Sequence, residues 1–316
     1  MPREIVVGSR QSELALWQAR WVVEQLKKVR PGYVFRIAGM KTKGDHLLDV
    51  PLARIGDRGL FTKELENALL AGACDLAVHS MKDLPTRLPE GLVIGAVCRR
   101  EDPGDVLVSR RGLTLKELPQ RARIGTSSLR RKAQLLRFRP DFEMVDVRGN
   151  LTTRLRKLFE QELDALVVAR AGLRRLGLEK EITEKIPFSV CLPAVGQGSI
   201  GVETRENDEE MRELLKDLDD QQARSAVTAE RAFLRRLEGG CQVPIGALGR
   251  VENGCLKLEG IVLSLDGQRY IRKEIFGPPQ EAGRLGEELA ERMLAGGAKE
   301  ILEQVRREFE EQWQKE

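Results

Sequence analysis

IGTSS at residues 124–128 decides the fold, because it repeats the pattern of VGSRQS at residues 7–12. In both segments an apolar run meets a glycine and is followed by hydroxyl-bearing residues that can start a helix. A second pair of segments supports the first. DALVV at 164–168 matches DLAVH at 75–79, and each follows a stretch with helical periodicity. The same order of elements therefore occurs twice, which predicts two related α/β lobes.

Residues 4–99 alternate short apolar runs with amphipathic stretches. The pattern predicts strands at 5–7, 34–40 and 75–79 and helices at 13–29 and 62–71. A series of this kind predicts a parallel sheet. Residues 44–59 hold three glycines and a proline, which indicates a long loop or lid.

The last hundred residues follow another pattern. Asn253-Gly254 and Asp266-Gly267 separate β-rich runs, as is typical of hairpin turns. Residues 281–312 have helical periodicity that is interrupted near Gly296-Gly297. This pattern predicts an antiparallel α+β domain. We expect three domains, with limits at 1–99 plus 200–217, 100–199, and 218–316.

The composition is that of a packed protein, with 41% hydrophobic and 32% charged residues in a chain of 316. No signal-peptide pattern and no run of about 18 apolar residues occurs, so we expect neither secretion nor membrane insertion, and a cytoplasmic location. Five cysteines without a CxxC spacing, beside two histidines, argue against a disulfide framework and against a metal site.

Arginine dominates the positive charge, supplying 37 of the 53 basic residues. A guanidinium can bind carboxylate or phosphate through two hydrogen bonds, although high genomic GC content or a hot habitat gives the same bias without a ligand. Aromatic residues make up only 4% and leave few platforms for base stacking, so nucleic acid is the weaker explanation.

Residues 121–156 contain nine arginines and three acidic residues. We interpret the segment as a site for a ligand with several negative charges. Thr126 to Ser128 can cap a helix whose free N–H groups favour an anion. Arg130 and Arg131 in its first turn oppose the helix dipole unless an anion or an acidic partner faces them. A solvated basic face is the alternative, and it suits the remaining arginines of the segment better: Arg137, Arg139 and Arg156.

HSMKDLP at residues 79–85 directly follows a predicted strand. Ligands of open α/β sheets bind beyond the carboxyl ends of strands, which places Lys82 and Asp83 for chemistry. A carboxylate there can stabilise a cation or exchange a proton with a substrate. The alternative is a turn carboxylate that bonds to backbone before Pro85. His79 ends an apolar run, and we expect it to be structural.

GGCQVP at residues 239–244 places Cys241 in a glycine-containing loop. Arg235 and Arg236 favour its thiolate and Glu238 opposes it, so a reactive cysteine is one interpretation. The remaining cysteines beside apolar strands are expected to be small core residues: Cys74, Cys98 and Cys255.

GQGSIG at residues 196–201 spells GxGxxG, but it continues into a β-type run, whereas a dinucleotide-binding fingerprint opens a helix. We interpret it as a hinge that returns the chain from the second lobe to the first.

Together these segments resemble the porphobilinogen deaminase family. The matching stretches occur in the family's order: GSRQSELALWQA (8–19), DRGLFTKELE (57–66), DLAVHSMKDLP (75–85), REDPGD (100–105), IGTSSLRR (124–131), RGNLTTRL (148–155), LPAVGQGSIGVE (192–203) and EGGCQVPIG (238–246). The resemblance implies two α/β lobes like those of periplasmic binding proteins, joined by a hinge, and a C-terminal α+β domain with a three-stranded antiparallel sheet that presents Cys241 to the cleft.

The resemblance also implies a transferase of tetrapyrrole biosynthesis. Members condense four porphobilinogen molecules head to tail, release four ammonia molecules, and hydrolyse off linear hydroxymethylbilane. The chain grows on a dipyrromethane cofactor, whose thioether would be at Cys241. Six rings with an acetate and a propionate each present twelve carboxylates, which an arginine-lined cleft can bind. The implied partners are porphobilinogen and the next enzyme of the pathway, with neither nucleic acid nor membrane, and the implied state is a monomer.

The family's motifs carry residue roles to this chain. Asp83 would be the catalytic carboxylate. The positions matching cofactor-binding residues are Lys82, Asp83, Thr126, Ser128, Arg130, Arg131 and Arg148, in addition to Cys241. The positions matching substrate-binding residues are Arg10, Ser12, Gln18, Arg148, Arg154 and Arg175. The chain departs from the pattern at Arg54 and Arg58, where some relatives have lysine, at Arg170, which is an extra arginine, and at Ser199, where alanine is usual.

The residues leave two rival functions, a non-enzymatic anion-binding receptor with the same two lobes, and a phosphoribosyl-type transferase that needs magnesium. We also expect the site to stay in place during elongation, while hinges near residues 99 and 200 and the lid at 44–59 make room for the product.

Overall fold

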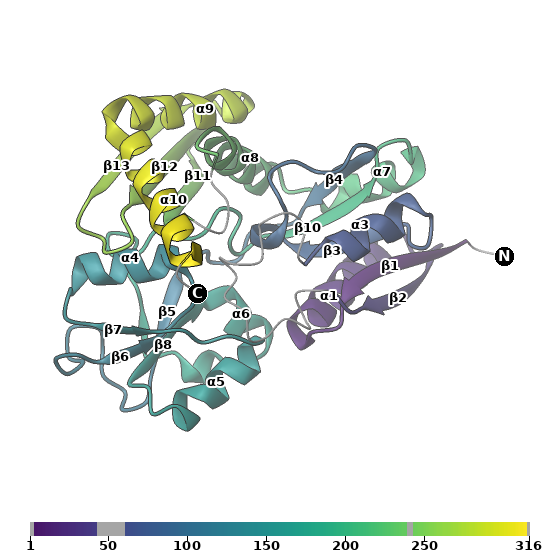
Figure 1. Ribbon diagram of the computed structural model, residues 1–316. Coiled ribbons are helices and arrows are strands. Elements are labelled where there is room, and N and C mark those ends of the chain that lie inside the picture. The colour runs from purple at the N-terminus through teal and green to yellow at the C-terminus, as the bar shows by residue number, and fades with distance from the viewer. Residues whose placement is uncertain (1–2, 43–60, 239–242, 315–316) are drawn as a thin grey trace.

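The computed structural model describes residues 3–42, 61–238 and 243–314. The described chain forms two five-stranded sheets and one three-stranded sheet, each with its own helices. Figure 1 shows them as three bodies, the first lobe on the right, the second lobe below and the C-terminal domain above. Within the described ranges, no helix combines the length and apolar character that crossing a bilayer requires.

The first sheet has the strand order β2-β1-β3-β10-β4. Its strands are β1 (Glu4–Arg10), β2 (Val34–Met40), β3 (Leu76–Ser80), β4 (Leu92–Val97) and β10 (Ile200–Arg205). β1 is parallel to β2 and β3, but β10 is antiparallel to both β3 and β4. The parallel arrangement predicted for residues 4–99 is confirmed, since β1, β2, β3 and β4 all run the same way, and the antiparallel strand is β10. This strand returns from the second lobe beside the end of β4, so it must run the opposite way.

Helices cover both faces of this sheet. α1 (Glu13–Val29) begins at Ser12, whose hydroxyl accepts a hydrogen bond from the backbone N–H of Ala15. α1 and α7 (Glu209–Leu215) pack into one apolar cluster with Ile5 and Val7 of β1. α3 (Lys63–Leu70) packs into a separate cluster around Leu65. The alternation of β1 side chains between the two faces explains the two clusters.

The second sheet repeats the order of the first, as β7-β6-β8-β5-β9. Its strands and helices are β5 (Asp105–Ser109), β6 (Arg123–Gly125), α4 (Leu129–Phe138), β7 (Glu143–Val145), α5 (Leu151–Glu160), β8 (Ala165–Ala169), α6 (Arg170–Arg175) and β9 (Glu184–Lys185). β6 is parallel to β7 and β8, and β5 is antiparallel to β8 and β9.

The predicted internal repeat is confirmed down to one pair of aspartates. The Asp75 carboxylate accepts a hydrogen bond from Val6 N at 2.8 Å, and Asp75 N donates to Val6 O at 2.8 Å. In the second lobe the Asp164 carboxylate accepts from Arg123 N at 2.8 Å, and Asp164 N donates to Arg123 O at 2.9 Å. Asp75 thus fixes β3 against β1, and Asp164 fixes β8 against β6. This shared role explains why DLAVH and DALVV both begin with aspartate.

The C-terminal domain is the predicted antiparallel sheet with helices. Its elements are α8 (Gln221–Arg236), β11 (Ile245–Glu252), β12 (Cys255–Leu263), β13 (Tyr270–Gly277), α9 (Ala282–Met293), a π-helical turn (Leu294–Ala298) and α10 (Lys299–Gln314). Both turns form where expected, and Asn253 and Gly254 have φ of 51° and 74°, as a tight hairpin turn requires. Gly297, with φ of 102°, marks the predicted interruption between α9 and α10.

The three-stranded sheet is covered on both faces. One face packs on the three helices of its own domain, around Phe233. The other face contributes Leu248 and Ile261 to a cluster with Ala133 of α4, so the sheet also rests on the second lobe. Cys255 is exposed, which makes its prediction as a core residue wrong, because it is the first residue of β12 directly after the turn. Cys74 and Cys98 are buried, as predicted.

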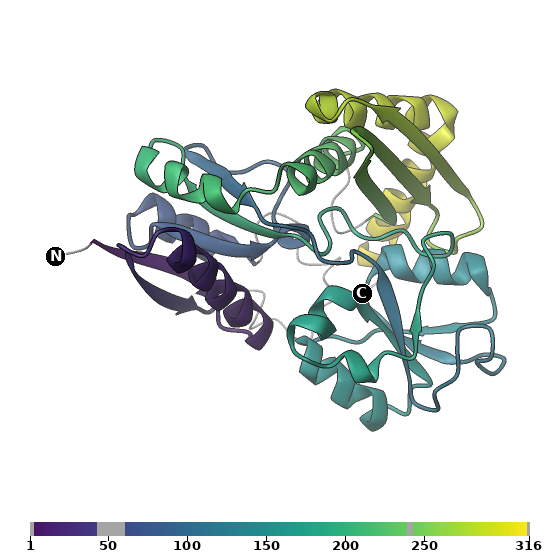
Figure 2. The ribbon, with the colours of Figure 1, turned by 180° about the vertical axis from the view of Figure 1, so that it is seen from behind.

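Two chain segments cross between the lobes, residues 98–104 and 193–199 (Figure 2). They lie so close that a Cβ on Gly198 would be 2.4 Å from Glu101 O, and the φ of Gly198 is +91°. After this glycine the chain enters β10 and not a helix. The rejection of a dinucleotide fingerprint is therefore confirmed.

Candidate active site

A short turn after β3 presents Lys82 and Asp83. The turn is the 3-10 helix η2 (Met81–Asp83), in which Met81 is buried while Lys82 and Asp83 are exposed. Met81 N donates to Ser199 O at 3.0 Å, which ties the turn to the hinge segment. Lys82 and Asp83 thus lie at the carboxyl end of β3, as predicted.

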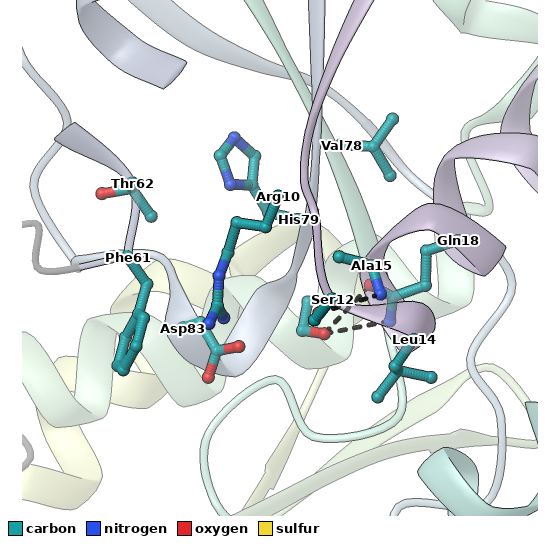
Figure 3. Close-up of a pocket in the computed structure, with 11 residues that line it drawn as sticks. Arg10, Ser12, Leu14, Ala15, Gln18, Phe61, Thr62, Val78, His79 and Asp83 are labelled. Atoms are coloured by element: carbon teal, nitrogen blue, oxygen red, sulfur yellow. Dashed lines mark hydrogen bonds between the residues drawn. The ribbon is translucent and has the colours of Figure 1, made fainter. Parts of the chain in front are cut away.

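Four of the predicted site residues line one cavity of the first lobe, namely Arg10, Ser12, Gln18 and Asp83. The cavity encloses about 390 Å³ of space that protein atoms do not fill, part of it open to solvent. The Arg10 guanidinium lies 4.3 Å from the centre of the Phe61 ring. Figure 3 shows that it points toward the Asp83 carboxylate. Both side chains therefore border the same cavity.

Polar contacts fix the floor of this cavity. Gln18 is buried, and its Nε2 donates to Ser80 Oγ at 2.9 Å. His79 is also buried, with its Nε2 3.1 Å from the Glu203 carboxylate. The second contact matches the prediction of a structural histidine, although its ring also borders the cavity.

Cations from both lobes face the turn. The pKa of Lys82 is lowered to about 8, first by loss of hydration in the cleft and then by Arg131 and Arg154, against the opposing effect of Asp83. Part of the Lys82 side chain nevertheless stays exposed to water. The pKa of Arg154 is lowered to about 10 by burial, with further lowering from Arg131 and Arg148.

These mutual effects show which predicted residues the fold brings together. Lys82 and Asp83 come from the first lobe, whereas Arg131 and Arg154 come from α4 and α5 of the second. Because electrostatic interaction weakens with distance, the two sets lie near one another. Crowded, partly dehydrated cations are held at a cost that a ligand with several carboxylates would relieve. The donor set therefore fits a ligand that carries several carboxylates.

Arg130 and Arg131 are buried and share an internal acidic partner, Asp105. Arg130 Nη1 donates to the Asp105 carboxylate at 2.7 Å, and Arg131 donates through Nη2 at 2.7 Å and Nε at 3.1 Å. Burial alone would raise the pKa of Asp105, but the two guanidiniums overcome this effect and hold it well below its ordinary value. This is the acidic partner that the helix N-terminus requires.

Sequence reasoning missed Asp105 as a site residue. It ends the REDPGD stretch and opens the buried run of β5, and an acid at the start of a buried strand is the signal that points to it. Ser128 caps α4, as predicted, with its hydroxyl accepting from Arg131 N, and Thr126 is buried beside it.

Two other predicted arginines bond to backbone carbonyls, Arg154 at the start of α5 and Arg175 at the hinge. Arg154 Nε donates to Gly149 O at 2.9 Å, and Arg175 Nη2 donates to Gly198 O at 2.6 Å. Arg170 pairs with Asp102, which gives the extra arginine a partner within the hinge region. Burial lowers the pKa of Arg175 to about 10.

Several predicted residues fall outside the described ranges. They are Cys241, the lid at 44–59, and Arg54 and Arg58 within it.

Two family models match the chain. "Porphobilinogen deaminase, dipyromethane cofactor binding domain" matches residues 5–213, and "Porphobilinogen deaminase, C-terminal domain" matches residues 225–295. A protein named porphobilinogen deaminase from Pelotomaculum thermopropionicum is 62% identical over 308 residues, covering 98% of this chain and 99% of the relative. One of the same name from Carboxydothermus hydrogenoformans is 58% identical over 311 residues, covering 98% of this chain and 100% of the relative.

Solved structures show a weaker likeness. The aliphatic sulphonate binding protein SsuA from Escherichia coli aligns with a TM-score of 0.41 and 13% identity, over 75% of this chain and 71% of that chain. A periplasmic domain of BvgS from Bordetella pertussis aligns with a TM-score of 0.42 and 16% identity, over 68% of this chain and 85% of that chain. These scores are too low to support a conclusion about the fold.

Proposed function

The chain belongs to the porphobilinogen deaminase family, and we propose that it joins four porphobilinogen molecules head to tail, releases four ammonia molecules and hydrolyses off linear hydroxymethylbilane. It is an enzyme of the transferase class and contains the family's dipyrromethane cofactor-binding domain. The observation that carries the proposal is the electrostatic interaction of Lys82 and Asp83 of the first lobe with Arg131 and Arg154 of the second.

Asp83 is the proposed catalytic carboxylate. When porphobilinogen loses ammonia, it becomes an azafulvene whose positive charge spreads onto the pyrrole nitrogen. A carboxylate beside that N–H stabilises the cation. The same group is placed to protonate the departing amine or to remove the final ring proton. Asp83 and Arg10 line the same cavity, which supports this role. Arg10 would bind a side-chain carboxylate of the substrate while Asp83 lies beside the reacting carbon.

Side-chain carboxylates of the substrate are assigned to a set of polar residues: Arg10, Ser12, Gln18, Arg148, Arg154 and Arg175. Planar guanidiniums match carboxylates through paired hydrogen bonds, which orients a ring as well as holding it. Arg10 and Gln18 border the cavity of the first lobe, and Arg154 of the second lobe interacts electrostatically with Asp83, which also borders it. A substrate that spans the cleft would therefore be held by both lobes.

The cofactor is assigned to Cys241, through a thioether, and to the surrounding polar groups: Lys82, Asp83, Thr126, Ser128, Arg130, Arg131 and Arg148. When bound, the dipyrromethane supplies the free pyrrole carbon to which the first substrate unit adds. Arg130 and Arg131 carry two positive charges and share the single negative charge of Asp105. The net charge of +1 on this group of three side chains can bind a cofactor carboxylate. Arg131 lies in the first turn of α4, where its positive charge opposes the helix dipole. A bound anion would stabilise this arrangement.

The domain limits stay a proposal, at 1–99 with 200–217, 100–199 and 218–316, and the place of β10 in the first sheet supports them. We also propose that the site stays in place while hinges near residues 99 and 200 and the lid at 44–59 yield space. We further propose that the enzyme is monomeric and cytoplasmic, and that it passes its product to the next enzyme of tetrapyrrole synthesis.

Product stoichiometry tests the function directly. Purified protein is incubated with porphobilinogen, and ammonia and hydroxymethylbilane are measured together. The proposal predicts four ammonia molecules for each bilane released. Binding without ammonia release would instead favour the anion-binding receptor, and a requirement for magnesium and a sugar phosphate would favour the phosphoribosyl transferase.

A further inference from the structure

We propose that Arg231 of α8 is a positioning residue that holds the turn carrying Lys82 and Asp83 in a fixed place on the C-terminal domain. Its Nη1 donates to Leu84 O at 3.2 Å, and its Nη2 donates to Pro85 O at 2.6 Å. These two carbonyls directly follow Asp83 in the chain. The inference rests on the proposed function, since it concerns the placement of the proposed catalytic carboxylate.

The face of α8 that carries Arg231 also packs against the turn. Ala223, Val227 and Arg231 are spaced by four residues and so lie on one side of the helix. Ala223 and Val227 pack in one apolar cluster with Met81 and Leu84. Figure 2 shows α8 between the first lobe and the C-terminal sheet. One helix face therefore contacts the turn through apolar side chains and through the guanidinium.

Arg231 resembles Arg154 and Arg175 in its hydrogen bonds. Within the described residues its hydrogen bonds go to carbonyls alone, whereas Arg284 on α9 pairs with Glu281 and Glu288. Burial lowers the pKa of Arg231 to about 10, with Arg235 adding to the effect and Glu203 opposing it. A half-buried guanidinium without a carboxylate partner is retained at a cost. Its planar fork can reach two consecutive carbonyls, which a single ammonium point charge does less well.

The helix also leads to the proposed cofactor anchor. α8 ends at Arg236, and Cys241 is five residues further along the chain. Because a helix is rigid, a turn fixed to α8 keeps its distance from the start of the anchor segment. Misplacement of a reacting group by about 1 Å can reduce a rate by on the order of 100-fold. Arg231 would therefore act on the rate of condensation through Asp83, while the proposed thioether keeps the cofactor attached.

The turn has a second attachment, which makes the role of Arg231 separable from folding. On the hinge side, Gly196 and Gly201 leave room for Met81, since a Cβ on either would lie 2.8 Å and 2.2 Å from its side chain. Met81 N also bonds to Ser199 O. Without Arg231 the buried part of the turn keeps these contacts, while the segment from Leu84 onward loses its polar attachment.

The test compares Arg231→Met and Arg231→Lys with Arg284→Met, a surface arginine of the same domain, in the cofactor-loaded protein. We expect Arg231→Met to keep the mass of the loaded protein, to lower kcat about tenfold, and to change KM less than about twofold. Amide exchange should accelerate in a peptide covering residues 81–88 and stay unchanged in one covering 164–175. Arg231→Lys retains donors for one carbonyl and should recover kcat to within about threefold of wild type. Arg284→Met should match wild type in all readouts.

Two results would overturn the inference. One is a kcat within twofold of wild type for Arg231→Met together with unchanged exchange at residues 81–88. The other is an equal loss in Arg231→Lys and Arg231→Met with faster exchange throughout the chain, which would indicate general destabilisation. A wild-type protein that does not turn over porphobilinogen would instead contradict the proposed function, and the exchange comparison would still decide whether Arg231 holds the turn.

Discussion

Replacing Asp105 with Asn should destabilise the second lobe more than any loss of a surface ion pair. The carboxylate is 1% exposed and lies between Arg130 and Arg131, which are 5% and 4% exposed. Asparagine keeps the shape but removes the negative charge. Two guanidiniums then stay buried with no counter-charge from this position, and breaking a buried ion pair in this way typically costs about 3–5 kcal/mol.

The contacts of Asp105 support this magnitude. Its carboxylate accepts from Arg130 Nη1 at 2.7 Å, from Arg131 Nη2 and Nε at 2.7 and 3.1 Å, and from Gln197 Nε2 at 2.9 Å. Hydrogen bonds to charged groups contribute roughly 1.5–3 kcal/mol each. The amide oxygen of asparagine can still accept one or two of these, so the loss should be smaller than their sum. A value of about 4 kcal/mol is a large share of the typical stability of a domain.

Urea unfolding at pH 7, followed by circular dichroism, measures the effect. Asp146→Asn is the matched control, because Asp146 pairs with Lys132 of the same helix but its side chain is 61% exposed. The control should lose less than about 1 kcal/mol. A loss in Asp105→Asn no greater than in the control would refute the reasoning.

The pH dependence of the same variant has a definite sign. The folded-state pKa of Asp105 lies below its ordinary value of 3.8, so the stabilisation is complete above that pH and is lost as the pH falls through the folded-state value. Wild type and Asp105→Asn should therefore differ fully at neutral pH and converge in strong acid.

Three further predictions concern the cleft. Asp83→Ala should keep the cofactor, as intact mass shows, but lose on the order of 10² to 10⁴ in turnover, and near-normal turnover would remove Asp83 from the mechanism. Arg131→Leu should impair assembly of the cofactor, so recovery of fully loaded protein by mass would contradict its assignment. Because the pKa of Lys82 is lowered to about 8, its positive charge should fade above that pH, and cofactor uptake by the apo-protein should weaken there in wild type but not in Lys82→Met; a matching decline in the variant would exclude Lys82 as the cause.

Local sequence patterns predict much of this fold. Asn253-Gly254 specifies its hairpin because both residues adopt positive φ, and the two lobes are recognisable because Asp75 and Asp164 begin equivalent strands with the same hydrogen bonds. The direction of β10 could not be inferred in this way. It depends on a chain that leaves one lobe, forms another and returns, and no local periodicity records that path.

The site is predictable in its parts but not in its assembly. The position of Asp83 follows from the strand before it, and that of Arg131 from the helix start that Ser128 caps. Their meeting in one cleft depends on how two lobes pack, which involves contacts distant in sequence. The pairing of Arg130 with Asp105 is a contact between residues that are 25 positions apart in the sequence. The contact of Arg231 with Pro85 joins residues that are 146 positions apart.

The mass of the intact, active protein tests the central proposal most directly. If a cysteine sulfur holds the growing chain, the wild-type protein should exceed its polypeptide mass by two linked pyrrole units, and Cys241→Ser should show the mass of the polypeptide alone and no turnover. Active wild-type protein with an unmodified mass, or a Cys241→Ser variant that retains the extra mass, would contradict the account.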